Sequence, residues 1–86
     1  MSYQIVVHPD VHDALKKLNK KDNSFYQRVK KKILELSKNP EIGKPLSNVL
    51  KGCRRVQIGH FVLIYEFKKA ENTITILNFE HHDNAY

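Results

Sequence analysis

Two adjacent arginines are the residues of this 86-residue chain that best suit chemistry on a phosphate. A guanidinium such as that of Arg54 or Arg55 can hold a phosphate through two parallel hydrogen bonds, or stabilise charge that develops on it in a transition state. An arginine can equally pair with a carboxylate or cover apolar surface with its aliphatic stem. Both uses are open from the sequence.

Histidines and a tyrosine form a second group of candidate residues. His81, His82 and Tyr86 fall within the last seven residues, and His60 lies earlier. An imidazole with an unperturbed pKa near 6.5 can give or take a proton at neutral pH. A polar terminus is also a common place for a chain to fray. We expect any chemistry to occur where Arg55 meets this C-terminal segment.

Metal, cofactor and membrane functions find little support in the sequence. Asp83 and the histidines offer ligand types for a metal, but no HxxxH or CxxC spacing joins them, so we expect no metal. No phosphate loop, dinucleotide motif or Ser/His/Asp order is present, and we expect no cofactor. The one cysteine, Cys53, fits a reducing compartment. Without a signal peptide or a run of about 20 apolar residues, the predicted location is the cytoplasm.

The charge balance points to an anionic partner. The chain has 15 Lys+Arg against 9 Asp+Glu, a net charge of +6 and a pI near 9.6. RNA, DNA or an acidic protein segment would suit such a surface. A charge of this size also serves solubility alone.

Local patterns predict one domain over residues 1–86, with strands and helices in the order β-α-α-β-β-β. Residues 3–7 alternate as a strand, and the apolar residue at 6 suggests burial on both faces. Pro9 and Asp10 start a helix, and Asp22, Asn23 or Ser24 caps a second helix that ends near residue 37. Lys30, Lys31 and Lys32 fan out over roughly 200° of that helix, which indicates a solvated face. Residues 39–45 and 46–50 are predicted loops.

Three strands follow, at 54–58, 61–67 and 73–79. Gly59 and His60 suit a two-residue hairpin turn, and the nearly all-apolar strand 61–67 belongs at the centre of the sheet. The predicted fold is α+β: an antiparallel sheet covered on one face by an α-helical hairpin. Its open face is the candidate surface, where Arg55 and Gln57 lie on the same side.

The ordered set of motifs resembles the RelE/ParE superfamily of toxins from type II toxin–antitoxin pairs, most closely the RelE and YafQ branch. The resemblance covers essentially the whole chain and rests on the element order and on these segments: Lys44-Pro45-Leu46, Gly52-Cys53-Arg54-Arg55-Val56, Phe61-Val62-Leu63-Ile64-Tyr65 and His81-His82-Asp83-Asn84-Ala85-Tyr86. It implies a metal-independent endoribonuclease that cuts mRNA in the ribosomal A site. The RNA's own 2′-hydroxyl would attack the adjacent phosphate, and a cognate RelB-like antitoxin would neutralise the toxin in a hetero-oligomer.

The resemblance also assigns roles to residues. Arg55 matches a basic position of the second strand, His81 or His82 matches the C-terminal basic position, and Tyr86 matches the terminal aromatic residue. Gln57 and Val62 stand where RelE commonly carries a lysine and an arginine, and His60 is near enough to substitute. The predicted catalytic residues are Arg55, His60, His81, His82 and Tyr86, and the predicted RNA-binding residues are Lys44, Lys51, Arg54 and Gln57.

Three other functions stay open. A ParE-like toxin would share the fold and inhibit DNA gyrase without nuclease chemistry, and the apolar Val62 keeps this alternative alive. A degenerate member would bind an antitoxin only. A generic basic RNA-binding domain is the remaining possibility.

Overall fold

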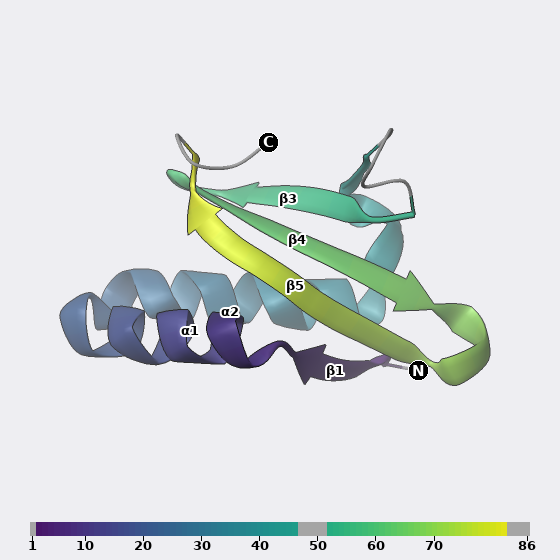
Figure 1. Cartoon of the computed structure of the whole chain (residues 1–86), viewed down its shortest axis with the longest axis horizontal. Helices are drawn as coiled ribbons and strands as arrows, with labels where there is room; N and C mark the ends of the chain where they lie inside the picture. The colour runs from purple at the N-terminus through teal and green to yellow at the C-terminus, as the bar shows by residue number, and fades with distance from the viewer. Residues whose placement is uncertain (1, 47–51, 83–86) are drawn as a thin grey trace.

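The structure, a computed structural model, describes residues 2–46 and 52–82. Within these residues two helices pack against one face of a five-stranded sheet (Figure 1). The elements, in chain order, are β1 (Gln4–Val7), α1 (Pro9–Lys21), α2 (Asn23–Lys38), the 3-10 turn η1 (Pro40–Ile42), β2 (Lys44–Pro45), β3 (Arg54–Ile58), β4 (Phe61–Lys68), the 3-10 turn η3 (Lys69–Glu71) and β5 (Thr73–His81). The predicted α+β order is confirmed, with the short β2 as an addition.

The strands lie in the order β1-β5-β4-β3-β2. β3, β4 and β5 form the predicted antiparallel meander, whereas β1 pairs in parallel with β5. β4 is the central strand, which explains its apolar sequence: residues 62–65 are all buried. Because β1 follows the N-terminus and β5 approaches the C-terminus, their pairing joins the two ends of the chain in one sheet.

The helices begin where local capping allows. Nδ1 of His8 accepts a hydrogen bond from the Asp10 amide (3.1 Å) at the start of α1. Oδ1 of Asp22 does the same for the Phe25 amide (3.1 Å) and caps α2. Both helices turn an apolar stripe towards the sheet, and the buried core collects residues from helices and strands alike: Val11, Val29, Leu36, Ile58, Leu63, Tyr65, Ile74, Ile76 and Phe79.

Three predictions about the strands were wrong. Lys44 and Pro45, predicted to belong to a loop, form β2 because they pair with Arg55 and Arg54 of β3. Val6 is 44% exposed rather than buried on both faces, because β1 is an edge strand and the helices cover only one face of the sheet. β5 runs to His81, two residues past the predicted end, because β4 supplies Phe61 and Val62 as pairing partners for His81 and Glu80. Of the predicted loop at 46–50, residues 47–50 lie outside the described part of the chain.

The β3–β4 hairpin turns at Gly59 and His60, as predicted. Gly59 has φ 59°, in the region that favours glycine, and Ile58 pairs with Phe61 across the turn. This turn therefore brings His60 beside the start of the central strand.

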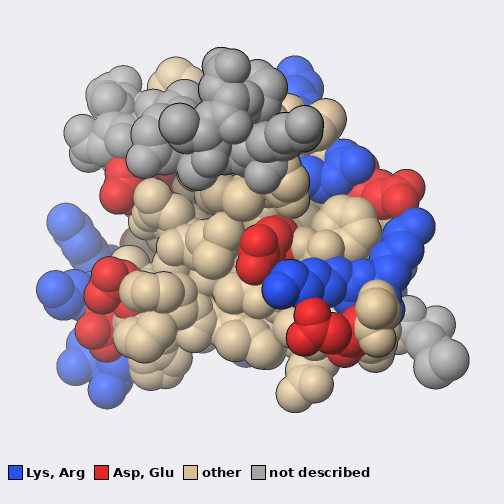
Figure 2. Space-filling view, turned by 45° about the vertical axis from the view of Figure 1, so that its right-hand side comes forward, with Lys and Arg blue, Asp and Glu red and all other residues tan. Residues whose placement is uncertain are grey.

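The surface mixes charges of both signs. On the face shown in Figure 2, acidic side chains stand beside basic ones at the margins, and charged side chains also lie near the centre among uncharged ones. Lys68 and Glu71 form an exposed ion pair, with Nζ and Oε2 3.7 Å apart. Among the described residues, no helix combines the length and apolarity that crossing a membrane would require.

Candidate functional site

Lys44 and Arg55 lie opposite each other on the sheet face that the helices leave open. They are register partners between β2 and β3, and directly opposed side chains have Cβ atoms about 4.5–5.5 Å apart. Gln57 is two residues further along β3 and shares their face, whereas Val56 and Ile58 point to the core. The open face therefore presents two cations and an amide, which together suit a phosphodiester.

The same face continues across the sheet with apolar and acidic residues. Val62 and Ile64 of β4 are 2% and 4% exposed. Next to them on β5 are the register partners Glu80 and Asn78. The position where the resemblance expects an arginine thus holds a buried valine. Sequence reasoning had placed Glu80 in a terminal segment, although alternation with the inward-facing Phe79 could have indicated a strand.

Arg54 faces the other way and is held by the fold. Its Nη1 donates to the carbonyl oxygens of Gly43 (2.8 Å) and Glu41 (3.3 Å). Its guanidinium carbon lies 5.7 Å from the centre of the Phe67 ring. These contacts fasten η1 and β2 to the edge of the sheet. They give Arg54 a structural role, and its predicted RNA contact remains a prediction.

Tyr65 completes that attachment from inside the core. Its hydroxyl donates to the Pro40 carbonyl oxygen (2.5 Å) and accepts from the Gly43 amide (3.0 Å). A side chain at Gly43 would collide with this hydroxyl, since an added Cβ would lie 2.5 Å from it. Burial raises the pKa of the Tyr65 phenol, so the hydroxyl keeps its proton at neutral pH. Tyr65 and Arg54 together set the position of Lys44 beside Arg55.

The histidines gather at the other end of the hairpin. The rings of His60 and His81 are stacked, with centroids 6.1 Å apart and an interplanar angle of 15°. The His82 amide donates to the His60 carbonyl oxygen (2.6 Å). Phe61 contacts His81 edge-on at 5.5 Å. The additional length of β5 produces this cluster, so the structure brings His60 together with His81 and His82, which follow much later in the sequence.

The histidine cluster and the Arg55 group are separate. Arg55 pairs with Ile64, while His81 pairs with Phe61, three residues along β4. At about 3.3 Å per residue the two rows are roughly 10 Å apart. One phosphate cannot touch both groups in this arrangement. Two further predicted residues, Lys51 and Tyr86, lie outside the described part of the chain.

The described part of the chain includes possible metal ligands and one cysteine. No three His, Cys, Asp or Glu side chains there are grouped so that they could hold a metal ion. Burial raises the pKa of the Cys53 thiol, and the nearby Glu66 carboxylate raises it further. A thiol with a raised pKa carries little thiolate at neutral pH and is a weak nucleophile.

Comparisons with known proteins agree with the fold. A solved toxin–antitoxin complex, RelBE2 from Mycobacterium tuberculosis, matches with a TM-score of 0.81 and 25% identity over 94% of this chain and 99% of that chain. An archaeal RelE–RelB complex from Pyrococcus horikoshii matches with a TM-score of 0.74 and 22% identity over 99% and 100%. The fold is thus the RelE-like α+β fold, with two helices on one face of a mixed sheet.

The sequence comparisons identify the family. The model for the ParE toxin of the type II toxin–antitoxin system parDE matches residues 5–86. A Methanocaldococcus jannaschii protein that bears the provisional name toxin RelE4 is 34% identical over 85 residues, which is 98% of this chain and 90% of the relative. The chain belongs to the ParE toxin family, within the RelE/ParE superfamily of type II toxin–antitoxin toxins.

Proposed function

We propose that this toxin is a ribosome-dependent endoribonuclease that cleaves mRNA codons in the A site and so stops translation in the cytoplasm. The observation that carries the proposal is the opposed pair Lys44 and Arg55 on the open sheet face. Two neighbouring cations can both donate hydrogen bonds to the oxygens of a phosphodiester. The RelE-type relatives support the same reading.

The chemistry divides between the two groups of residues. Attack by a 2′-hydroxyl on the adjacent phosphate builds negative charge on the phosphoryl oxygens, which Arg55 stabilises with Lys44 beside it. The attacking hydroxyl must lose a proton and the leaving oxygen must gain one. His60, His81 and His82 are the candidate proton carriers, because an imidazole ring can both donate and accept a proton. Because one phosphate cannot touch both groups in the free structure, this division requires that binding on the ribosome brings a histidine within hydrogen-bond reach of the phosphate that Arg55 holds.

The Arg55→Ala variant tests this assignment. We expect mRNA cleavage on ribosomes to fall by about 100-fold, the scale seen when one donor to a developing oxyanion is removed. Cleavage is measured by primer extension on a translated mRNA. Lys17→Ala is the matched control, since it removes one exposed cation from α1, which packs on the opposite face. Cleavage by Arg55→Ala at the control rate would remove Arg55 from the site.

Gyrase inhibition is the second candidate function. The matching family model describes ParE toxins, and the buried Val62 and neutral Gln57 leave two family cations missing here. A DNA supercoiling assay with purified gyrase separates the two. Inhibited gyrase with intact mRNA would overturn the nuclease proposal, and inactivity in both assays would indicate a member that only binds its antitoxin.

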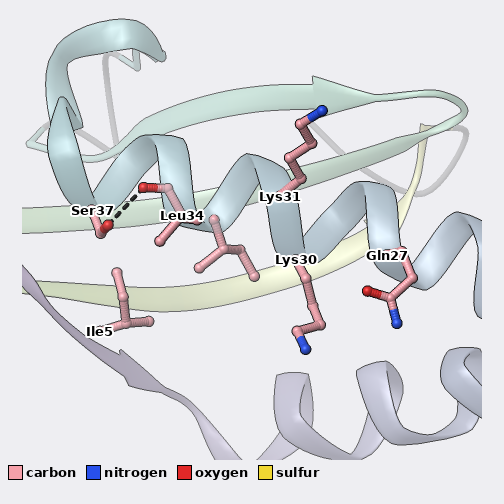
Figure 3. Close-up of a pocket in the computed structure, with 7 residues that line it drawn as sticks. Ile5, Gln27, Lys30, Lys31, Leu34 and Ser37 are labelled. Carbon is pink, nitrogen blue, oxygen red and sulfur yellow. Dashed lines mark hydrogen bonds between the residues drawn. The ribbon is translucent and has the colours of Figure 1, made fainter.

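We also propose that a cognate RelB-like antitoxin binds this chain, as antitoxins do in the two solved complexes. An apolar groove of about 550 Å³ between β1 and α2 suits this partner. Figure 3 shows Ile5 and Leu34 at this groove and Lys30 and Lys31 pointing away in opposite directions. Leu34 is 57% exposed, and the described lining contains no Asp or Glu. An amphipathic, acidic antitoxin segment could pack its apolar side chains into this groove and pair its acidic side chains with the lysines at the edge.

Leu34→Glu tests the antitoxin contact. A carboxylate in an apolar interface opposes binding, so we expect affinity for the co-encoded acidic protein to fall about tenfold or more. The measurement is calorimetric titration of purified toxin with that protein. Lys17→Glu, at an exposed position of α1, is the control for added negative charge. Unchanged affinity in Leu34→Glu would place the antitoxin elsewhere, while mRNA cleavage by this variant should persist.

A further inference from the structure

We propose that a hollow between the α1–α2 corner and the β3–β4 turn binds one unpaired RNA base, and that the adjoining groove binds its phosphate. This inference rests on the proposed RNA-cutting function and names a nucleotide subsite for it. The hollow has a volume of about 540 Å³, within the range of small-ligand sites. Its described lining is Leu18, Lys21, Asp22, Phe25, Arg28, Gly59, His60 and Phe61.

The walls of the hollow are aromatic. Phe25 of α2 and Phe61 of β4 are half-buried, and their ring centroids are 5.5 Å apart at 40°. Arg28 places its guanidinium carbon 5.4 Å from the centre of the Phe25 ring. Unpaired RNA bases are recognised by stacking on aromatic rings and on arginine planes, and both are available here.

Gly59 gives the hollow its shape. It has φ 59°, and an added Cβ would lie 2.8 Å from Cε1 of Phe25 and 3.9 Å from Nη1 of Arg28. The β3–β4 turn can therefore lie directly against α2. A larger residue would push the turn away from Phe25 and change the hollow.

The phosphate groove begins where the hollow ends. Arg28 and Gly59 line both, and the groove of about 400 Å³ continues along α2 past Lys31 and Lys32 to Gln57. Nζ of Lys32 is 3.0 Å from Oε2 of Glu35, so one of the three cations is offset by the one acid in the described lining. A net positive charge therefore remains in the groove beside the aromatic hollow. A bound nucleotide could place its base in the hollow and its phosphate in the groove.

The hollow also adjoins the histidine cluster. His60 lines it, and His81 stacks on His60 and contacts Phe61. A base bound there would place its strand next to the candidate proton carriers, whereas Arg55 lies three residues along β4 and on the other face of the sheet. An aromatic hollow that adjoins a groove with excess positive charge favours a nucleotide over an acidic peptide, because a nucleotide joins a base to a phosphate.

The test uses single-stranded RNA without ribosomes. The probe is a fluorescein-labelled ten-nucleotide RNA, and its binding is followed by fluorescence anisotropy over a series of salt concentrations. We expect Arg28→Gln to weaken binding about five- to tenfold and to reduce the salt slope by about one contact. Lys17→Gln, a matched loss of one exposed α1 charge, should bind like the wild type. Thermal melts establish that both variants are folded.

A second probe isolates the base contact. The same strand with abasic residues keeps its phosphates, so we expect it to bind more weakly to the wild type, with less difference in a Phe25→Leu variant. Amide NMR shifts at Gly59 and Phe61 on addition of AMP or UMP would locate the site. Equal binding of the base-bearing and abasic strands, or equal behaviour of Arg28→Gln and Lys17→Gln, would overturn the subsite. Shifts produced by an aromatic acidic peptide and not by the nucleotides would assign the hollow to a protein partner instead.

These results separate the subsite from the proposed function. RNA binding that depends on Arg28, without any mRNA cleavage on ribosomes, would support the proposed subsite and contradict the proposed nuclease activity. Cleavage that depends on Arg55, combined with RNA binding that does not depend on Arg28, would support the proposed nuclease activity and contradict the proposed subsite.

Discussion

At the scale of single residues, adjacent side chains of one type perform different tasks. Arg54 bonds to backbone carbonyls of η1 and the adjoining loop, whereas Arg55 faces the open side of the sheet opposite Lys44. The alternation of a strand is sufficient to separate them. Of the two adjacent arginines, Arg54 therefore has a structural role on one face of the sheet, and Arg55 is a candidate site residue on the other.

Tyr65 carries the first residue-scale prediction for stability. Tyr65→Phe removes a buried hydroxyl and leaves the Gly43 amide and the Pro40 carbonyl oxygen without this partner. We expect the free energy of unfolding to fall by about 1–3 kcal/mol. Urea denaturation at pH 7 measures the loss. Tyr26→Phe is a control, because Tyr26 is only half-buried on the helical side.

The same residue predicts a dependence on alkaline pH. The folded-state pKa of Tyr65 is raised above its ordinary value near 10, so the folded protein holds this proton more tightly than the unfolded chain. Its contribution to stability is then full below about pH 10 and declines as pH rises further. The stability difference between wild type and Tyr65→Phe should shrink between pH 9 and pH 11. A difference that grew over this range would contradict the assignment.

At the scale of elements, the β3–β4 hairpin and the end of β5 position the candidate site residues. The turn at Gly59 positions His60, and the extra residues of β5 bring His81 and His82 beside it. At the opposite end, β2 is a two-residue strand whose pairing presents Lys44 next to Arg55. Short strand pairings thus position both groups of candidate residues.

Gly59→Ala is the prediction that belongs to the hairpin. Both the positive φ and the close approach of Phe25 oppose a side chain at this position, and we expect a loss of about 1–3 kcal/mol in unfolding free energy. Gly52→Ala is the matched control, because Gly52 also has positive φ, 96°, but an added Cβ there meets nothing within 4 Å. Denaturation curves compare the two. Equal losses of unfolding free energy in the two variants would mean that the Phe25 ring moves aside with no loss of stability.

At the scale of the whole molecule, charge is distributed over several surfaces rather than concentrated in one patch. Lys30 lies 5.7 Å from the centre of the Tyr26 ring, Lys32 pairs with Glu35, and Lys31 borders both the groove at β1 and the groove at β3. The predicted divergence of these three lysines is confirmed. The positive charge is therefore spread over at least two separate faces.

The salt dependence of RNA binding follows from this distribution. If Lys44, Arg55, Arg28 and Lys31 contact about four phosphates of a single strand, the logarithm of the binding constant should fall with the logarithm of salt concentration with a slope of about −3. The measurement is a salt titration of RNA binding by anisotropy. A slope near zero would show that the positive charge serves solubility and not RNA.

The sequence by itself determined the number, order and approximate bounds of the main elements. Helical periodicity, Pro9 in the first turn of α1, the cap at Asp22 and the glycine turn at Gly59 act over a few residues, so they can be recognised locally. The apolar run of β4 predicted its central place for the same reason. The family resemblance rested on this order and is confirmed.

Only the tertiary structure decided how the candidate residues meet. The parallel pairing of β1 with β5, the attachment of β2 by Arg54 and Tyr65, and the stacking of His60 on His81 all join residues distant in sequence. Such contacts depend on which strands become neighbours, and local periodicity carries no information on that choice. The division of the site into an arginine group and a histidine group is a consequence of strand register alone.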